Sequence, residues 1–138
     1  VLFIECIAFI LCLFLTIIRM RFLGDAAPYV TNQLMNANAA YLGYIMLVFA
    51  TFNSIFLAVF FKTAYKIGKP FILFCVVGTI IIFMGEILHH IPGLESLNDS
   101  SNLNVPQIVI LLFGVAMFKL CTWFSFQKAI KDFERIDL

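Results

Sequence analysis

The hydrophobic pattern of the chain consists of four long apolar segments with polar residues gathered between them. These segments cover residues 1–18, 41–61, 70–88 and 106–126. A helix rises about 1.5 Å per residue, so the shortest segment is about 27 Å long and matches the roughly 30 Å hydrocarbon core of a bilayer. The pattern therefore predicts an all-α, polytopic integral membrane bundle of four transmembrane helices, followed by a tail over residues 127–138.

The composition agrees with lipid as the surrounding solvent. Hydrophobic residues make up 63% of the chain and charged residues 12%, whereas soluble domains contain about 45–50% apolar and about 25% charged residues. A soluble fold of this length would leave much of that apolar surface in water. The formal net charge of +1 gives no electrostatic basis for binding nucleic acid. The lipid bilayer is therefore the expected partner, and nucleic acid is not.

The distribution of Lys and Arg between the polar segments predicts the orientation in the membrane. Positive residues stay preferentially on the cytoplasmic side. The side opposite the tail carries two of them, Arg19 and Arg21. The tail and the linker between the second and third segments carry six, namely Lys62, Lys66, Lys69, Lys128, Lys131 and Arg135. The count places the linker and the C-terminus in the cytoplasm.

The second apolar segment carries small and polar residues that predict a helix contact. Ala50, Ser54 and Ala58 recur every four residues, the spacing at which small side chains let two helix backbones approach closely in lipid. Thr51 and Asn53 lie beside this stripe, and an amide this deep in a bilayer needs a hydrogen-bond partner. Asn53 therefore either bonds to a neighbouring helix or, together with Thr51, lines a transport path.

Two charged residues inside the apolar segments form a second candidate pair. Glu5 lies near the start of the first segment, and Lys119 lies before the end of the fourth at a similar depth. An ion pair between them would position the first and last helices. A proton relay is the alternative, but it needs a chain of titratable groups in the membrane, and the sequence shows none. We therefore favour the ion pair.

The remaining patterns that carry chemistry are weak. Glu86 and His89 have the E-x-x-H spacing of di-iron bundle proteins, but that chemistry needs the motif twice, so we interpret them and His90 as an interfacial group at a helix end. The four cysteines lie in apolar runs without metal or disulfide spacing. The sequence contains no nucleotide-binding, nucleophile-elbow or zinc motif. The chain is not expected to be an enzyme or to hold a cofactor or metal of its own.

Two stretches, residues 52–70 and 124–138, resemble the permease subunits of bacterial type 2 ABC transporters of the exporter-like kind. The first, FNSIFLAVFFKTAYKIGKP, is similar to the family's fourth span and the short cytoplasmic turn after it. The second, FSFQKAIKDFERIDL, is similar to the serine, lysine, aromatic and acidic pattern that closes many such chains. The four segments would then be the family's third to sixth spans. Because Val1 already lies in an apolar run, we expect this chain to be part of a longer protein, and the resemblance implies that this protein has six spans.

The resemblance implies a membrane-spanning permease subunit in the bacterial cytoplasmic membrane. Two such subunits, identical or different, would move substrate by alternating access, with ATP and Mg²⁺ bound by a separate ATP-binding subunit. Members of this branch are associated with export of peptides and antimicrobial compounds, so an amphiphilic peptide is the expected substrate. The alternative is a small four-span accessory or immunity protein with no coupled ATPase.

Overall fold

The computed structural model describes residues 1–23, 34–62, 66–100 and 102–136. Within these residues the chain forms helices and no strands, and four helices are long and apolar enough to cross a bilayer. This confirms the predicted all-α membrane fold. The first, third and fourth spans are the helices α1 (Leu2–Phe22), α5 (Gly68–Leu88) and α6 (Val105–Ile136). The second span consists of α3 (Ala39–Thr51), the π-helical segment η1 (Phe52–Leu57) and α4 (Ala58–Lys62).

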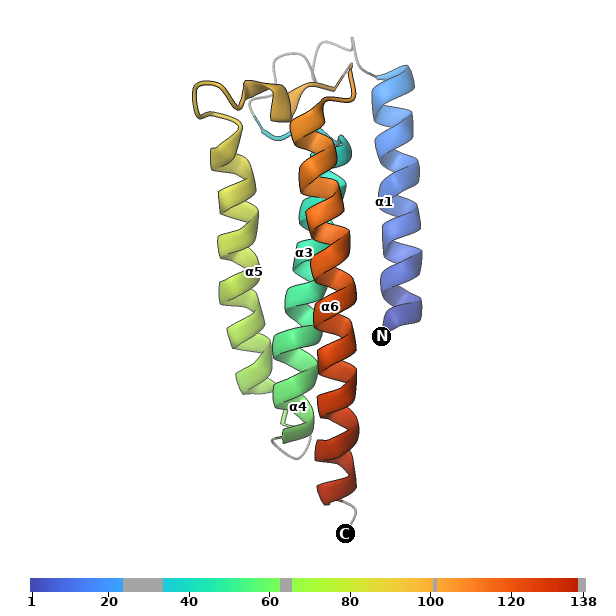
Figure 1. The fold of residues 1–138 in the computed structure, drawn as a ribbon, viewed down its shortest axis with the longest axis vertical. Helices are drawn as coiled ribbons and strands as arrows, with labels where there is room; N and C mark the ends of the chain where they lie inside the picture. Colours follow the sequence, from blue (N-terminus) through green and yellow to red (C-terminus); the bar gives the residue numbers. More distant parts are fainter. Residues whose placement is uncertain (24–33, 63–65, 101, 137–138) are drawn as a thin grey trace.

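The helix ends follow from the local sequence. Asn38 caps α3, because its side-chain oxygen accepts a hydrogen bond from the Tyr41 N–H at 3.1 Å, as expected of an asparagine at this position. Pro70 lies in the first turn of α5, where its missing N–H removes no bond within the helix. The last helix continues from the fourth apolar segment through most of the tail to Ile136, and Figure 1 shows α6 projecting past the other helices.

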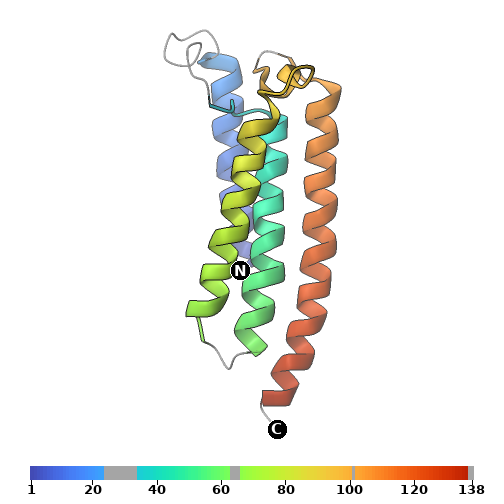
Figure 2. The ribbon, with the colours of Figure 1, turned by 90° about the vertical axis from the view of Figure 1, so that its left-hand side faces the viewer.

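The helical rods run alternately up and down and lie side by side (Figures 1 and 2). The starts of α1 and α5 and the ends of α4 and α6 lie at what we call the lower end (Figure 1). The upper end holds the opposite helix ends and the 3-10 turn η2 (Glu95–Asn98). α3, η1 and α4 form a central rod that packs against α6 along its length, and parts of this rod also contact α1 and α5. The rod therefore brings its side chains within reach of three neighbouring helices.

Two glycines let α3 and α6 touch backbone to backbone. A Cβ added at Gly43 would lie 2.6 Å from the Ile110 carbonyl oxygen, and a Cβ added at Gly114 would fall on the Gly43 carbonyl oxygen. Association of helices in lipid relies on such close packing, since lipid tails supply no hydrophobic driving force between helices. The contact between α3 and α6 therefore depends on the absence of side chains at these two positions.

The small-residue stripe predicted in the second apolar segment lies inside the bundle. Ala50 and Ala58 are buried, and Ser54 is half-buried. The Ser54 hydroxyl donates to the Ala50 carbonyl oxygen at 2.7 Å, so it is satisfied within its own helix. The stripe thus presents small side chains to the interior without exposing an unpaired hydroxyl.

Amide side chains tie the upper end together. Asn38 donates to the carbonyl oxygens of Leu97 and Asp99 at 2.7 and 3.1 Å. Gln107 donates to those of Ser96 and Asp99 at 3.0 and 2.8 Å. Both amides are fully buried, so these bonds replace the water that loop carbonyls would otherwise use. The loop after α5 is therefore joined to the starts of α3 and α6.

Candidate functional site

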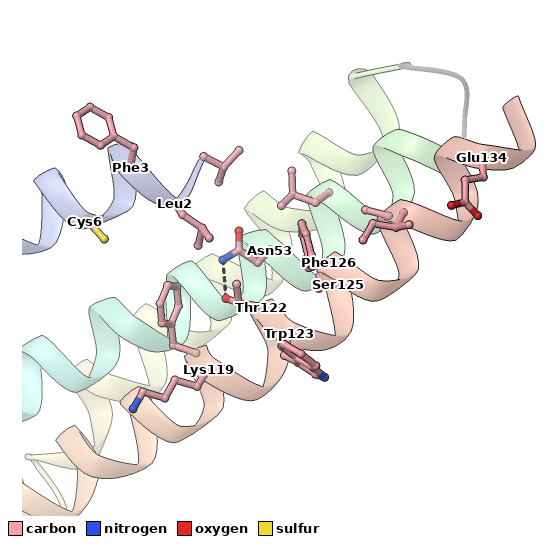
Figure 3. A pocket seen from close by; sticks show the side chains of 15 residues that line it. Leu2, Phe3, Cys6, Asn53, Lys119, Thr122, Trp123, Ser125, Phe126 and Glu134 are labelled. Atoms are coloured by element: carbon pink, nitrogen blue, oxygen red, sulfur yellow. Dashed lines mark hydrogen bonds between the residues drawn. The ribbon is translucent and has the colours of Figure 1, made fainter. Parts of the chain in front are cut away.

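Three polar side chains from three different helices meet inside the bundle. Asn53 of η1 donates from Nδ2 to Glu5 Oε2 of α1 at 3.2 Å and to Thr122 Oγ1 of α6 at 2.9 Å. Asn53 is 0% exposed and Glu5 is 6% exposed. A buried polar group left without a partner costs about 1–3 kcal/mol, so the burial of Asn53 depends on these interhelical bonds. Figure 3 shows the bond to Thr122.

This polar cluster leaves two acceptor atoms without a hydrogen bond. Glu5 Oε1 and Asn53 Oδ1 are both buried, and neither has a partner among the described residues. The two Nδ2 hydrogens of Asn53 are already used by Glu5 and Thr122. An unpaired carboxylate oxygen in an apolar interior is costly. The cluster therefore has room for a further hydrogen-bond donor or a cation.

The π-helical segment carries Asn53 into the cluster. η1 interrupts the α-helical geometry of the central rod between α3 and α4. Thr51 and Ser54 each donate their hydroxyl to the carbonyl oxygen four residues earlier, at 2.8 and 2.7 Å, and such bonds often bend helices. Short π-helical segments are rare and occur frequently at functional sites. The hydropathy pattern does not predict this segment, and its one signal in the sequence is the grouping of polar residues within an apolar span.

An apolar cavity of about 1210 Å³ lies beside the polar cluster, between the start of α1, η1 and the second half of α6 (Figure 3). Glu5 lines a smaller cavity of about 140 Å³, and Cys6 and Phe118 line both cavities. Thr51 lines neither. The combination of apolar walls and a few convergent polar groups is typical of ligand sites. The larger cavity is lined by Asn53, Thr122, Leu2, Phe3, Trp123 and Phe126, among others.

The structure does not bring Glu5 and Lys119 together. The Glu5 carboxylate accepts from Asn53, while the Lys119 side chain is exposed and points away from Asn53 in Figure 3. The rotation of α6 is the reason. Thr122 takes the position that faces Asn53, and Lys119, three residues earlier, is turned by about 60° around the helix axis. The Asn53 amide, in place of an ion pair, links the first and last helices.

Glu86 joins the end of α5 to the segment before α3, and two histidines follow it at the end of the helix. Glu86 Oε2 accepts a hydrogen bond from the Met35 N–H at 3.0 Å. His89 is buried, and its ring centroid lies 4.1 Å from that of His90. Across the described part of the chain, no group of three or more His, Cys, Asp or Glu is placed to hold a metal ion. We assign these contacts to the architecture of the upper end.

The lysines of the linker gather at the lower end of the bundle. Lys62 ends α4, and Lys69 lies in the first turn of α5. Both are exposed, as is Lys66 between them, and residues 63–65 of the linker lie outside the described residues. Lys128 and Lys131 are exposed on the lower part of α6. The lower end is therefore rich in positive charge.

Comparison with known proteins identifies the family. A protein-family model described as ABC-2 family transporter protein matches residues 1–134, a range that includes all four candidate membrane spans. No curated protein and no solved structure matches the chain. Membrane proteins of this family are transport components that work with ATP-binding subunits in a bilayer. The chain is therefore a multi-pass membrane protein and belongs to the ABC-2 transporter family.

Proposed function

We propose that this chain is the permease subunit of an ATP-driven exporter of amphiphilic peptides or antimicrobial compounds. The family match over residues 1–134 is the observation that carries the permease role. The cavity beside the polar cluster supports an amphiphilic substrate, because apolar side chains such as Leu2 and Phe118 share it with Asn53. A peptide with one apolar face and a few polar donors suits this combination.

The transport cycle would be completed by partner subunits in the bacterial cytoplasmic membrane. The sequence contains no nucleotide-binding motif, so ATP and Mg²⁺ would be held by a separate ATP-binding subunit whose hydrolysis drives alternating access. A second permease subunit, identical or related, would supply the other half of the translocation path. Large apolar side chains are exposed along α1 and α5, including Phe14 and Phe83, and leave surface for lipid and for this second subunit.

We also propose that the lower end faces the cytoplasm, because positive residues are retained on that side and the linker lysines gather there. A green fluorescent protein fused to the C-terminus should fluoresce, since it folds in the cytoplasm. An alkaline phosphatase fused at the same place should be inactive, since it needs the oxidising outer compartment. The opposite pattern for the two reporters would place the lower end outside and refute this orientation.

The composition of the purified complex tests the permease role. The full-length protein would be tagged in its native host, purified in mild detergent and analysed by mass spectrometry. We expect a stoichiometric ATP-binding subunit, and ATP hydrolysis by the complex that rises when an amphiphilic peptide is added. Recovery of this chain alone, or with another membrane protein and no ATPase activity, would favour an accessory or immunity protein that binds peptide without coupled hydrolysis.

A further inference from the structure

We propose that the polar cluster, in which Asn53 lines the larger cavity and Glu5 lines the smaller one, binds the ammonium group of a cationic amphiphile, with Glu5 Oε1 and Asn53 Oδ1 as the acceptors. The ligand is a membrane-soluble molecule with an apolar body and a primary amine, as on an amine-bearing amphiphilic peptide. The statement that this ligand is transported cargo rests on the proposed function. The statement that the chain binds the ligand does not depend on that function, because the site is formed within this chain.

Glu5 Oε1 and Asn53 Oδ1 are the two acceptor atoms that an ammonium group would bind. Both are buried without a partner among the described residues, and one of them belongs to a carboxylate. Since Asn53 already uses its N–H groups to donate to Glu5 and Thr122, each of the two unpaired oxygens needs a hydrogen-bond donor from elsewhere. A primary ammonium has three N–H donors and a positive charge. It would satisfy both oxygens and neutralise the carboxylate, whereas a hydroxyl has a single donor and no charge.

No lysine or arginine side chain in the described part of the chain forms an ion pair with this carboxylate, although the amino group of Val1 lies close enough to act on it electrostatically. Lys119 is the candidate by depth, but its side chain is exposed and points away from Asn53 (Figure 3). Arg19 lies near the other end of α1, where it donates to the Leu23 carbonyl oxygen and to Asn36 Oδ1 at 3.0 and 2.9 Å. Glu5 Oε1 itself has no hydrogen-bond partner in the described part of the chain, so this oxygen is available to an ammonium donor from outside the chain.

The walls of the two cavities suit the rest of such a molecule. The larger cavity, of about 1210 Å³, exceeds the roughly 300–1,000 Å³ of ordinary small-molecule sites, so it has room for an alkyl chain or several side chains. Phe118 borders both cavities, and an aromatic ring attracts a nearby cation through its face. These walls favour an amphiphile over a small hydrophilic amine.

The depth of the cluster separates this ligand from the head groups of the surrounding lipids. Asn53 lies nine residues before Lys62, the end of α4, which corresponds to about 13 Å along the helix axis. Lipid head groups lie in the interfacial region outside the hydrocarbon core. The site therefore favours an amphiphile that inserts its amine below the interface.

The test uses the full-length protein in phosphatidylcholine nanodiscs, with any tryptophan outside this sequence replaced by phenylalanine, and Trp123 fluorescence is the signal. Trp123 is the single tryptophan of this sequence and lines the cavity. The probes are a bromoalkyl ammonium and the matched bromoalkyl alcohol, because bromine quenches tryptophan fluorescence on contact. We expect the ammonium to quench at about tenfold lower concentration than the alcohol, and the difference to fall below about threefold in Glu5→Gln. Each probe partitions into lipid equally in samples of the unmodified protein and of Glu5→Gln, so partition cancels when the ammonium-to-alcohol ratios of the two proteins are compared.

Lys119→Gln serves as the matched control, because Lys119 lines the cavity but takes no part in the cluster, and it should keep the preference for the ammonium. Equal quenching by ammonium and alcohol in the unmodified protein, compared at equal concentrations of membrane-bound probe, would overturn the proposal, even if Glu5→Gln failed to fold. A preference that survives in Glu5→Gln would also overturn it. Loss of the preference when phosphatidylethanolamine is added would assign the site to a lipid head group instead.

The ligand site and the permease role are tested separately. An ammonium preference in a protein that recruits no ATP-binding subunit would leave the site in place and refute coupled transport. If the protein recruited a stoichiometric ATP-binding subunit but showed no ammonium preference, the permease role would be supported and the ammonium site refuted.

Discussion

Gly114→Ala is expected to lower the free energy of unfolding by about 3 kcal/mol, at the upper end of the usual range for overpacking. The added Cβ would fall on the Gly43 carbonyl oxygen, a backbone atom that no side-chain rotation can move. α6 would have to withdraw from α3, and the close packing that joins these helices in lipid would be lost. Titration of the purified protein with sodium dodecyl sulfate, followed by circular dichroism, measures the change.

Gly78→Ala in α5 is the matched control for this substitution. It introduces the same methyl group in the middle of a membrane helix, but the nearest atom is a side-chain carbon of Phe74 at 3.6 Å, an ordinary contact distance. Alanine also favours the helix over glycine by up to about 1 kcal/mol, so stability should stay the same or rise. If both variants unfolded at the same detergent fraction, the Gly43 and Gly114 backbones would not be in close contact in the membrane.

The four spans were predictable from the sequence because lipid imposes a strict requirement on the backbone. Every polar backbone group in the hydrocarbon core must be bonded within the chain, so a long apolar segment has few alternatives to a helix. The ends were less predictable. α1 continues past the apolar segment to Phe22, where Arg19 bonds to the Leu23 carbonyl oxygen and to Asn36. A hydropathy pattern contains no information about such partners.

The polar cluster was predictable only in part. The need of Asn53 for a hydrogen-bond partner follows from its depth in the bilayer, but the choice of partner depends on how α6 is rotated about its axis. Lys119 and Thr122 lie within one turn of each other, so depth alone does not decide between them. Their different roles follow from the angular relation of the helices, which the structure shows and one-dimensional spacing does not.

The close contact between α3 and α6 illustrates the same limit. Gly43 lies seven residues before Ala50 and so continues the small-residue stripe by two helical turns. That spacing indicates which face of the second span packs against a neighbour. It does not indicate that Gly114 lies opposite, because a single sequence does not reveal which positions on two helices meet.

Asn53→Leu is expected to cost about 3 kcal/mol of unfolding free energy, because it removes the donor to the buried Glu5 carboxylate. Leucine has the same branching at Cγ as asparagine but is larger, so the loss would combine the missing hydrogen bonds with a packing cost at this buried position. Thr51→Val is the control. The Thr51 hydroxyl bonds to the Leu47 carbonyl oxygen of its own helix, so this change should stay within about 0.5 kcal/mol of the unmodified protein. Both variants are measured by the same detergent titration.

A double-mutant cycle then separates the Glu5–Asn53 bond from other effects of the Asn53 substitution. Once Glu5→Leu has removed the carboxylate, Asn53→Leu no longer leaves a buried charge without a donor. The double variant should therefore lose about 1–2 kcal/mol less than the sum of the single losses, the coupling expected of residues in direct contact. Additive losses would show that the two side chains do not interact across α1 and η1. In that case Glu5 Oε1 and Asn53 Oδ1 would not share one environment, and an ammonium group bridging them would no longer be tenable.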